Sequence, residues 1–211
     1  MEKWNKNLLM KMMLLYVLIA GLIGLTKIEE TREELYCPNY SIKSYEAMDF
    51  VKKNKMDSTV CFLIDMKVHS GKKRFAIWDL VGDSALREIV VSHGSAGAKG
   101  LEFSEADKPI FSNIPSSYAS SLGRYRIGKR SYSNWGINVH YKLHGLDSTN
   151  NNAFKRIIVL HSFIGVNQSE VYPEEAPYSL GCPMVSNEDM TYLDELLKTK
   201  KNVLMWIYYQ E

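Results

Sequence analysis

The chain contains few cysteines. Only Cys37, Cys61 and Cys182 occur among its 211 residues, and no two of them form a Cys-x-x-Cys pair. The lack of such a pair argues against a structural zinc site. In an exported protein, an odd number of cysteines leaves at least one thiol unpaired. Whether Cys37 and Cys61 form a disulfide stays open, because a sequence does not give the distance between them.

The chain also lacks a strong excess of charge. Its 26 lysines and arginines face 24 acidic residues, which gives a net charge of +2, whereas a nucleic-acid-binding domain usually carries a basic patch or stripe. Short basic runs such as 72–74 are interpreted as solvated faces or turns. A phosphate-binding G-x-x-x-x-G-K-[ST] loop is missing. His140 and His144 would stand about 13 Å apart on a strand, too far to share a metal. We expect no nucleic acid, metal or cofactor.

The N-terminus has a composition of its own. Lys3, Lys6 and Lys11 precede an uncharged apolar run over residues 12–25, the pattern of a secretory signal or a signal anchor. The run is short for a spanning helix, which needs about 20 apolar residues. We therefore predict that residues 1–27 direct export to the periplasm or cell envelope. Cleavage of this segment or its retention as the only membrane contact stays open, as does the oligomeric state.

Residues 28–56 are predicted to form a linker and an N-terminal helix. The helix is expected over residues 41–54, with Ser41 as its N-cap. Apolar residues recur there at three-residue spacing, which predicts that one face packs on the domain: Ile42, Tyr45, Met48 and Val51.

From residue 57 to 211 the pattern favours a mainly β domain with one or two peripheral helices. The segment 136–146 alternates apolar and polar residues, as a half-exposed strand does, and 156–162 reads as an apolar strand buried on both faces. A second helix is expected after Ser186, whose spacing to Asp189 resembles a capping box. Rich β-branched and aromatic content predicts the other strands: 59–66, 74–80, 87–93, 124–128 and 202–209.

His161 and Cys182 are the candidate catalytic pair. His161 ends the predicted strand, and Cys182 follows 182 − 161 = 21 residues later, after a loop that contains Gly165 and two prolines. Such a loop can return the chain beside the strand, where an imidazolium would favour the nucleophilic thiolate. Gly181 allows an unusual backbone conformation or a close substrate approach. Taken alone, the pattern also fits a buried cysteine with an unrelated histidine.

Four blocks of sequence, taken in order, resemble the murein L,D-transpeptidase catalytic domain family. They are "VVSHGSAG" (90–97), "FSNIPSSYASSLGRY" (111–125), "HGLDSTNNNAFKRIIVLH" (144–161) and "SLGCP" (179–183). The family hallmark is a histidine followed by a Ser/Thr-x-Gly-Cys segment. The resemblance extends from about residue 59 to 209 and implies a mainly β, L,D-transpeptidase-like sandwich or barrel with the cysteine in a cleft.

The resemblance also implies an exported cysteine acyltransferase that acts on peptidoglycan stem peptides. Cys182 would form a thioester with a stem peptide, and an amine from another stem would resolve it into a cross-link. His161 would be the general base and acid, and the Cys182 amide with flexible Gly181 would stabilise the oxyanion. Ser179, or the carbonyl of Ser162, would orient His161.

Other polar residues are candidates for substrate contacts. His93 opens a glycine-containing loop, and Asn113 and Ser121 lie in a polar loop; structural bonding and turn capping are the alternatives. Two departures from the family stand beside the nucleophile. Leu180 replaces a second histidine found in many relatives, and residues 177–178 are Pro-Tyr where a related subgroup has Gly-Arg.

Two other functions remain as alternatives. One is an L,D-carboxypeptidase or cysteine peptidase, which would use water in place of the acceptor amine. The other is a non-catalytic cell-wall-binding module that kept the fold. A metal site of His93, His161 and Cys182 is the weakest hypothesis.

Overall fold

The computed structural model describes residues 15, 16, 18, 36, 38–97 and 109–210. The chain divides into two units, 1–37 and 38–211. Of the predicted signal or anchor segment 1–27, only residues 15, 16 and 18 are described. Cys37 lies outside the described residues. Within the described part of the chain, no helix has the length and apolar character needed to cross a bilayer.

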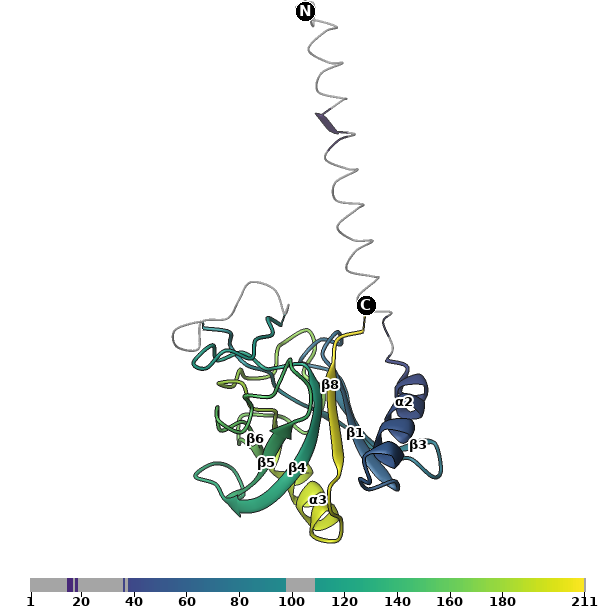
Figure 1. The fold of residues 1–211 in the computed structure, drawn as a ribbon. Coiled ribbons are helices and arrows are strands. Elements are labelled where there is room, and N and C mark those ends of the chain that lie inside the picture. The colour runs from purple at the N-terminus through teal and green to yellow at the C-terminus, as the bar shows by residue number, and fades with distance from the viewer. Residues whose placement is uncertain (1–14, 17, 19–35, 37, 98–108, 211) are drawn as a thin grey trace, which may run out of the picture. The chain divides into compact units, whose positions relative to one another are not determined.

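The second unit is built on one eight-stranded sheet, which confirms the mainly β prediction (Figure 1). Its order is β3-β2-β1-β8-β4-β5-β6-β7. Neighbouring strands are antiparallel except for the parallel pairs β1–β8 and β6–β7. The strands are β1 (Val60–Asp65), β2 (Lys73–Asp79), β3 (Ser84–Val90), β4 (Gly123–Tyr132), β5 (Val139–Gly145), β6 (Val159–Ser162), β7 (Met184–Val185) and β8 (Leu204–Tyr208).

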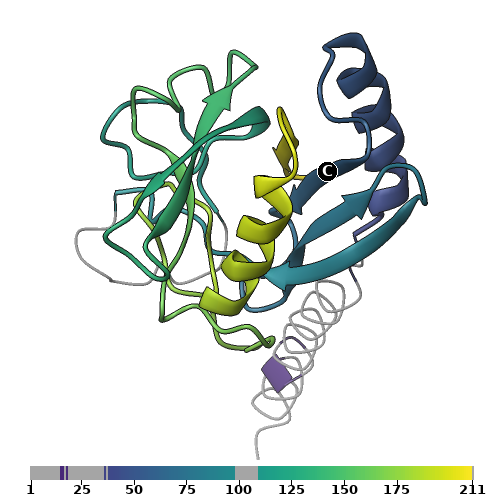
Figure 2. The same ribbon diagram turned by 90° about the horizontal axis from the view of Figure 1, so that it is seen from below.

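Helix α3 (Asn187–Lys198) packs on one face of this sheet, with buried Met190 and Leu193 in the main core. Residues from all eight strands, including the end strands β3 and β7, belong to the same core, and α3 lies between the two halves of the sheet in Figure 2. Ser186 is the N-cap, as predicted, and its Oγ accepts from the Asp189 amide at 3.0 Å. The helix therefore begins where its capping sequence indicates.

Strand β1 is buried on both faces because a helix covers each of them. Phe62 and Ile64 point into the core with α3, whereas Cys61 and Leu63 pack with residues of α2 (Tyr40–Lys53). Cys61 is a free, fully buried thiol. This double burial explains why β1 reads as a continuous apolar run in place of an alternating one.

Helix α2 confirms the predicted element and half of its predicted apolar face, Met48 and Val51, but not its cap. Asn39 is the N-cap, accepting from the Ile42 amide, and Ser41 lies inside the helix. Ile42 and Tyr45 are exposed. The buried face consists of Val51, as predicted, together with Tyr40, Ser44 and Ala47. Small Ser44 and Ala47 allow the helix to lie close to the sheet, a packing choice that a hydrophobicity pattern does not reveal.

The predicted strand 156–162 is shorter than expected. Only Val159–Ser162 form β6, and Ile157 is 74% exposed with a φ of 59°. The apolar run thus begins in a turn that bends the chain onto the sheet. In contrast, β5 alternates buried and partly exposed residues as predicted.

Candidate active site

Cys182 lies at the edge of β6. Because His161 pairs with Met184 in the parallel β6–β7 register, Cys182 lies opposite Val159. The Val159 amide donates to the Cys182 Sγ at 3.4 Å, and the thiol lies 3.8 Å from the Ile157 carbonyl oxygen. The side chain is partly buried. The loop therefore returns to the strand that carries the candidate histidine, as the sequence predicts.

His161 is buried and oriented by its own neighbour. Its Nδ1 lies 3.0 Å from the Ser162 carbonyl oxygen. Because a carbonyl only accepts, Nδ1 carries the proton and the lone pair of a neutral ring is on Nε2. Val159 and His161 are two residues apart on β6, so their side chains share a face of the sheet. The Cys182 thiol thus contacts the same short strand that carries the His161 imidazole.

Both members of the pair favour their neutral forms. Burial raises the pKa of the Cys182 thiol, and the Val159 amide and the charge of Arg156 only partly oppose this. Burial also lowers the pKa of His161, against a smaller opposite effect of the Ser162 carbonyl. Burial thus disfavours the ion pair that the sequence suggested for these two residues, and no hydrogen bond or ion pair joins Cys182 and His161 among the described residues.

Ser179 and Gly181 shape the loop that carries the cysteine. The Ser179 hydroxyl donates to the Cys182 carbonyl at 2.6 Å and accepts from the Gly181 amide at 3.0 Å. Gly181 has a φ of 111°, and a Cβ there would lie 2.8 Å from the Ala119 carbonyl oxygen. Only glycine combines this conformation with this close approach.

Ser179 does not orient His161 in this structure. Its hydroxyl is occupied within the cysteine loop, and its carbonyl accepts from the Ser95 amide. The orienting contact comes from Ser162, the other carbonyl expected for this task. Among the described residues, the Cys182 amide makes no hydrogen bond, whereas the Gly181 amide is bonded. The geometry leaves the Cys182 amide as the candidate oxyanion donor.

His93 supports the loop that carries Cys182. It is buried, its Nδ1 lies 2.9 Å from Arg74 Nη2, and its ring packs edge-on against Tyr178. Burial and the charge of Arg74 lower the pKa of His93 to about 2, so the ring is neutral. Its carbonyl accepts from the Ser179 amide at 2.8 Å. This is the structural role that the sequence left as an alternative to substrate contact.

Arg74 corrects the interpretation of the basic run 72–74. Its side chain is fully buried, in place of lying on a solvated face. Its guanidinium donates to the carbonyls of Val91 and Val68 as well as to His93. These acceptors lie before and after strands, at positions that a local pattern of charge does not indicate.

Asn113 and Ser121 bond within the protein. Asn113 donates to Ser148 and Asn151 through its amide, and its side-chain oxygen accepts from the Asn152 amide. Its role is therefore to hold two loops together. The Ser121 hydroxyl accepts from Arg156 at 2.7 Å, which brings this loop to the residues beside Cys182.

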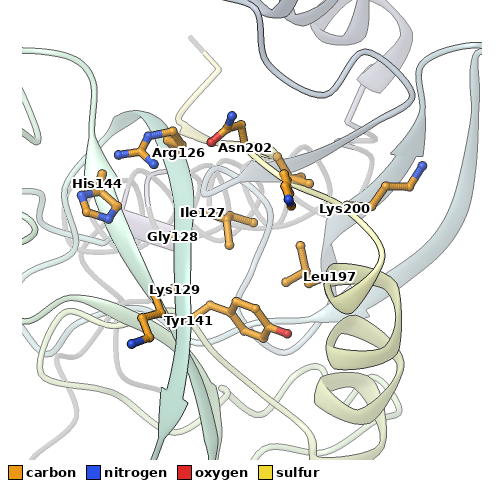
Figure 3. A pocket seen from close by; sticks show the side chains of 11 residues that line it. Arg126, Ile127, Gly128, Lys129, Tyr141, His144, Leu197, Lys200 and Asn202 are labelled. Carbon is orange, nitrogen blue, oxygen red and sulfur yellow. The ribbon is translucent and has the colours of Figure 1, made fainter.

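A separate pocket of ≈ 420 Å³ lies between β4, β5 and the end of α3 (Figure 3). Neither Cys182 nor His161 lines it. Several lining residues are basic, but the Lys129 and Lys200 side chains extend away from its centre in Figure 3, and Lys200 donates to Thr59. The charges do not converge on one point, so the candidate chemistry stays at Cys182.

The chain matches a known protein family. Residues 33–208 match the family described as the L,D-transpeptidase catalytic domain. The chain belongs to this family. Membership supports a peptidoglycan-related function, and members of the family are typically extracytoplasmic. No curated protein matches the chain.

The solved structures that resemble this chain share little sequence identity with it. An L,D-transpeptidase of Xylanimonas cellulosilytica is 15% identical, with 72% of this chain and 61% of that chain covered and a TM-score of 0.40. Bd1075 of Bdellovibrio bacteriovorus is 15% identical (74% and 49% covered, TM-score 0.42). The helical cell shape determining protein Pgp2 of Campylobacter jejuni is 13% identical (78% and 56% covered, TM-score 0.41). The chain thus matches between about half and three-fifths of their lengths.

Arg156 is the residue at this site whose importance the sequence did not indicate. It begins the apolar run before His161 and reads as structural. In the folded protein its Nη2 lies 3.2 Å from where a Cβ on Gly181 would be, and its charge acts on Cys182. The sequence offered little indication of this role because the hydrogen-bond partners of Arg156 are loop residues 112–121, far away in the chain.

Proposed function

We propose that this L,D-transpeptidase family member is an exported cysteine acyltransferase that cross-links peptidoglycan stem peptides through a thioester at Cys182. The observation that carries the proposal is the bond between the Val159 amide and the Cys182 thiol, two residues from His161 on the same strand. The family match over 33–208 supports the substrate class. The predicted export segment 1–27 agrees with a substrate outside the inner membrane.

In the first step, the Cys182 Sγ gives its proton to His161 Nε2 and attacks the carbonyl of the L-centre before a terminal D-residue. A C–S bond forms, and the negative charge on the carbonyl oxygen receives the Cys182 amide hydrogen bond. The C–N bond to the D-residue then breaks, and His161 returns the proton to the leaving amine. The products are a thioester and a free D-amino acid.

In the second step, an amine from another stem peptide attacks the thioester. His161 accepts the amine proton, the C–S bond breaks, and the proton passes to the Cys182 sulfur. A new amide cross-link and the free thiol result. The Ser162 carbonyl keeps the imidazole in the tautomer that both steps need.

The proposal is tested with the full-length chain in detergent, a tetrapeptide muropeptide and mass spectrometry of the products. We expect cross-linked dimers from the wild type, none from Cys182→Ala, and dimers from the matched control Cys61→Ala, which removes a buried thiol whose pKa is raised to about 12. A carbapenem is expected to form a covalent adduct that maps to Cys182.

Other results would replace the proposal by a specific alternative. Trimmed stems without dimers would indicate a carboxypeptidase. Muropeptide binding without turnover or a carbapenem adduct would indicate a cell-wall-binding module. Unchanged turnover in Cys182→Ala would remove the assignment of the nucleophile.

A further inference from the structure

The guanidinium of Arg156 is surrounded by neutral oxygen atoms. Its Nη1 donates to the Ser112 carbonyl at 2.9 Å and to the Ser121 hydroxyl at 2.7 Å. Its Nη2 donates to the Ala119 carbonyl at 2.6 Å and to the Ser117 hydroxyl at 3.3 Å. In the part of the chain that the structure describes, no carboxylate pairs with it. An arginine stays charged in a protein, so within the described residues this charge has no fixed carboxylate counter-ion.

The four hydrogen bonds also decide what Arg156 does not do. Two hydrogens on each terminal nitrogen account for four donors, and all four are directed to Ser112, Ser117, Ala119 and Ser121. A guanidinium that binds a substrate carboxylate offers a pair of free parallel donors. Arg156 therefore acts as a fixed charge that the protein itself holds in place, and not as a substrate ligand.

This fixed charge lies close to the residue that precedes the candidate nucleophile. Nη2 is 3.2 Å from the position of a Cβ on Gly181, the residue before Cys182. Arg156 also precedes Ile157, whose carbonyl oxygen lies 3.8 Å from the thiol. The backbone of both neighbours thus fixes the cation and the sulfur relative to each other.

We infer that Arg156 is a positioning residue for the charge at Cys182: it is the counter-ion of the thiolate that forms when the thiol gives its proton to His161. This deepens the proposed function and rests on Cys182 being the nucleophile. A cation with no carboxylate partner stabilises a nearby anion, and this offsets part of the cost of forming a thiolate in a partly buried site.

The other ionisable groups near the thiol do not supply this charge. Tyr125 on β4 is buried with its hydroxyl bonded to the Ser121 carbonyl, and burial raises its pKa. Burial lowers the pKa of His161 on β6, and that of His140, its partner on β5. All three groups are neutral at neutral pH, so the fixed positive charge comes from Arg156.

The inference is tested by the rate of alkylation of Cys182 with iodoacetamide between pH 6 and 11, in full-length chain carrying Cys37→Ser, with the modified site mapped by mass spectrometry. We expect R156Q to shift the rate–pH curve to higher pH by about one pH unit or more. At pH 8, alkylation of Cys182 should then be about tenfold slower than in the wild type. The curves should converge at high pH, where both thiols are ionised. R156K, which keeps the charge, should stay close to the wild type.

Lys155→Gln is the matched control, because Lys155 is exposed and its substitution removes the same charge next to Arg156; its curve should not move. A wild-type curve for folded R156Q, or a rate lowered equally at every pH, would overturn the inference. If R156Q does not fold, a displaced curve for R156K has the same consequence. Alkylation needs no peptidoglycan, so a shifted curve without cross-linking activity would remove the proposed function and leave this inference intact.

Discussion

Gly181→Ala gives a direct test of how tightly the cysteine loop is built. The φ of 111° at Gly181 is one that an L-residue rarely adopts, and a Cβ would lie 2.8 Å from the Ala119 carbonyl oxygen. The strained backbone costs about 1–3 kcal/mol. Crowding a well-packed site costs about 1–3 kcal/mol more. We therefore expect Gly181→Ala to lower the free energy of unfolding by about 2–6 kcal/mol.

Gly97→Ala separates the two costs. Gly97 also has a positive φ, 88°, but among the described residues a Cβ there would meet the Ser117 carbonyl oxygen alone, at 3.9 Å. This variant should lose only the backbone part, about 1–3 kcal/mol. Urea unfolding followed by circular dichroism measures both variants.

The same pair distinguishes an effect on stability from an effect on the site. A shift of the loop by about 1 Å can lower turnover by about 100-fold, so Gly181→Ala should lose cross-linking activity even where it is fully folded. Gly97→Ala should keep it. Equal losses of stability in the two variants, or full activity in folded Gly181→Ala, would refute the reasoning that the approach to Ala119 fixes the loop.

Two further predictions concern the base and the first helix. Since burial lowers the pKa of His161 and the base must be unprotonated, kcat/KM should fall only as the pH drops below the ordinary histidine value of about 6.5; an acid limb at or above that value would contradict this. Asn39→Ala should cost about 1 kcal/mol of unfolding free energy because it removes the N-cap of α2. Ser41→Ala should change the unfolding free energy very little. A larger loss for Ser41→Ala than for Asn39→Ala would indicate that Ser41 is the N-cap, as expected from the sequence.

The sequence predicted those parts of the fold that depend on local pattern. The alternation in β5 and the capping residues at Ser186 and Asp189 act over a few residues, so their consequences are readable in the chain. Two of the four residues predicted for the apolar face of α2, Ile42 and Tyr45, were wrong because the small residues Ser44 and Ala47 pack against the sheet in their place.

The sequence also named a candidate pair, since His161 and Cys182 stand in an ordered series of motifs; its catalytic role stays a prediction. The protonation state of the two residues was not predictable from the sequence. Whether a thiol and an imidazole form an ion pair depends on how far each is removed from water, and burial here favours the neutral form of both.

By itself, the sequence determined the family, the mainly β class, and the identity of the candidate nucleophile and base. Only the tertiary structure decided which groups surround them. Ser162, and not Ser179, bonds to the His161 imidazole, His93 supports the cysteine loop from within the protein, and Arg156 lies against Gly181, the residue before Cys182. The physical reason is that hydrogen bonds and charges act over a few ångströms in space, whereas the residues that supply them here lie far apart in the chain, as His93 and Ser179 do at 179 − 93 = 86 positions.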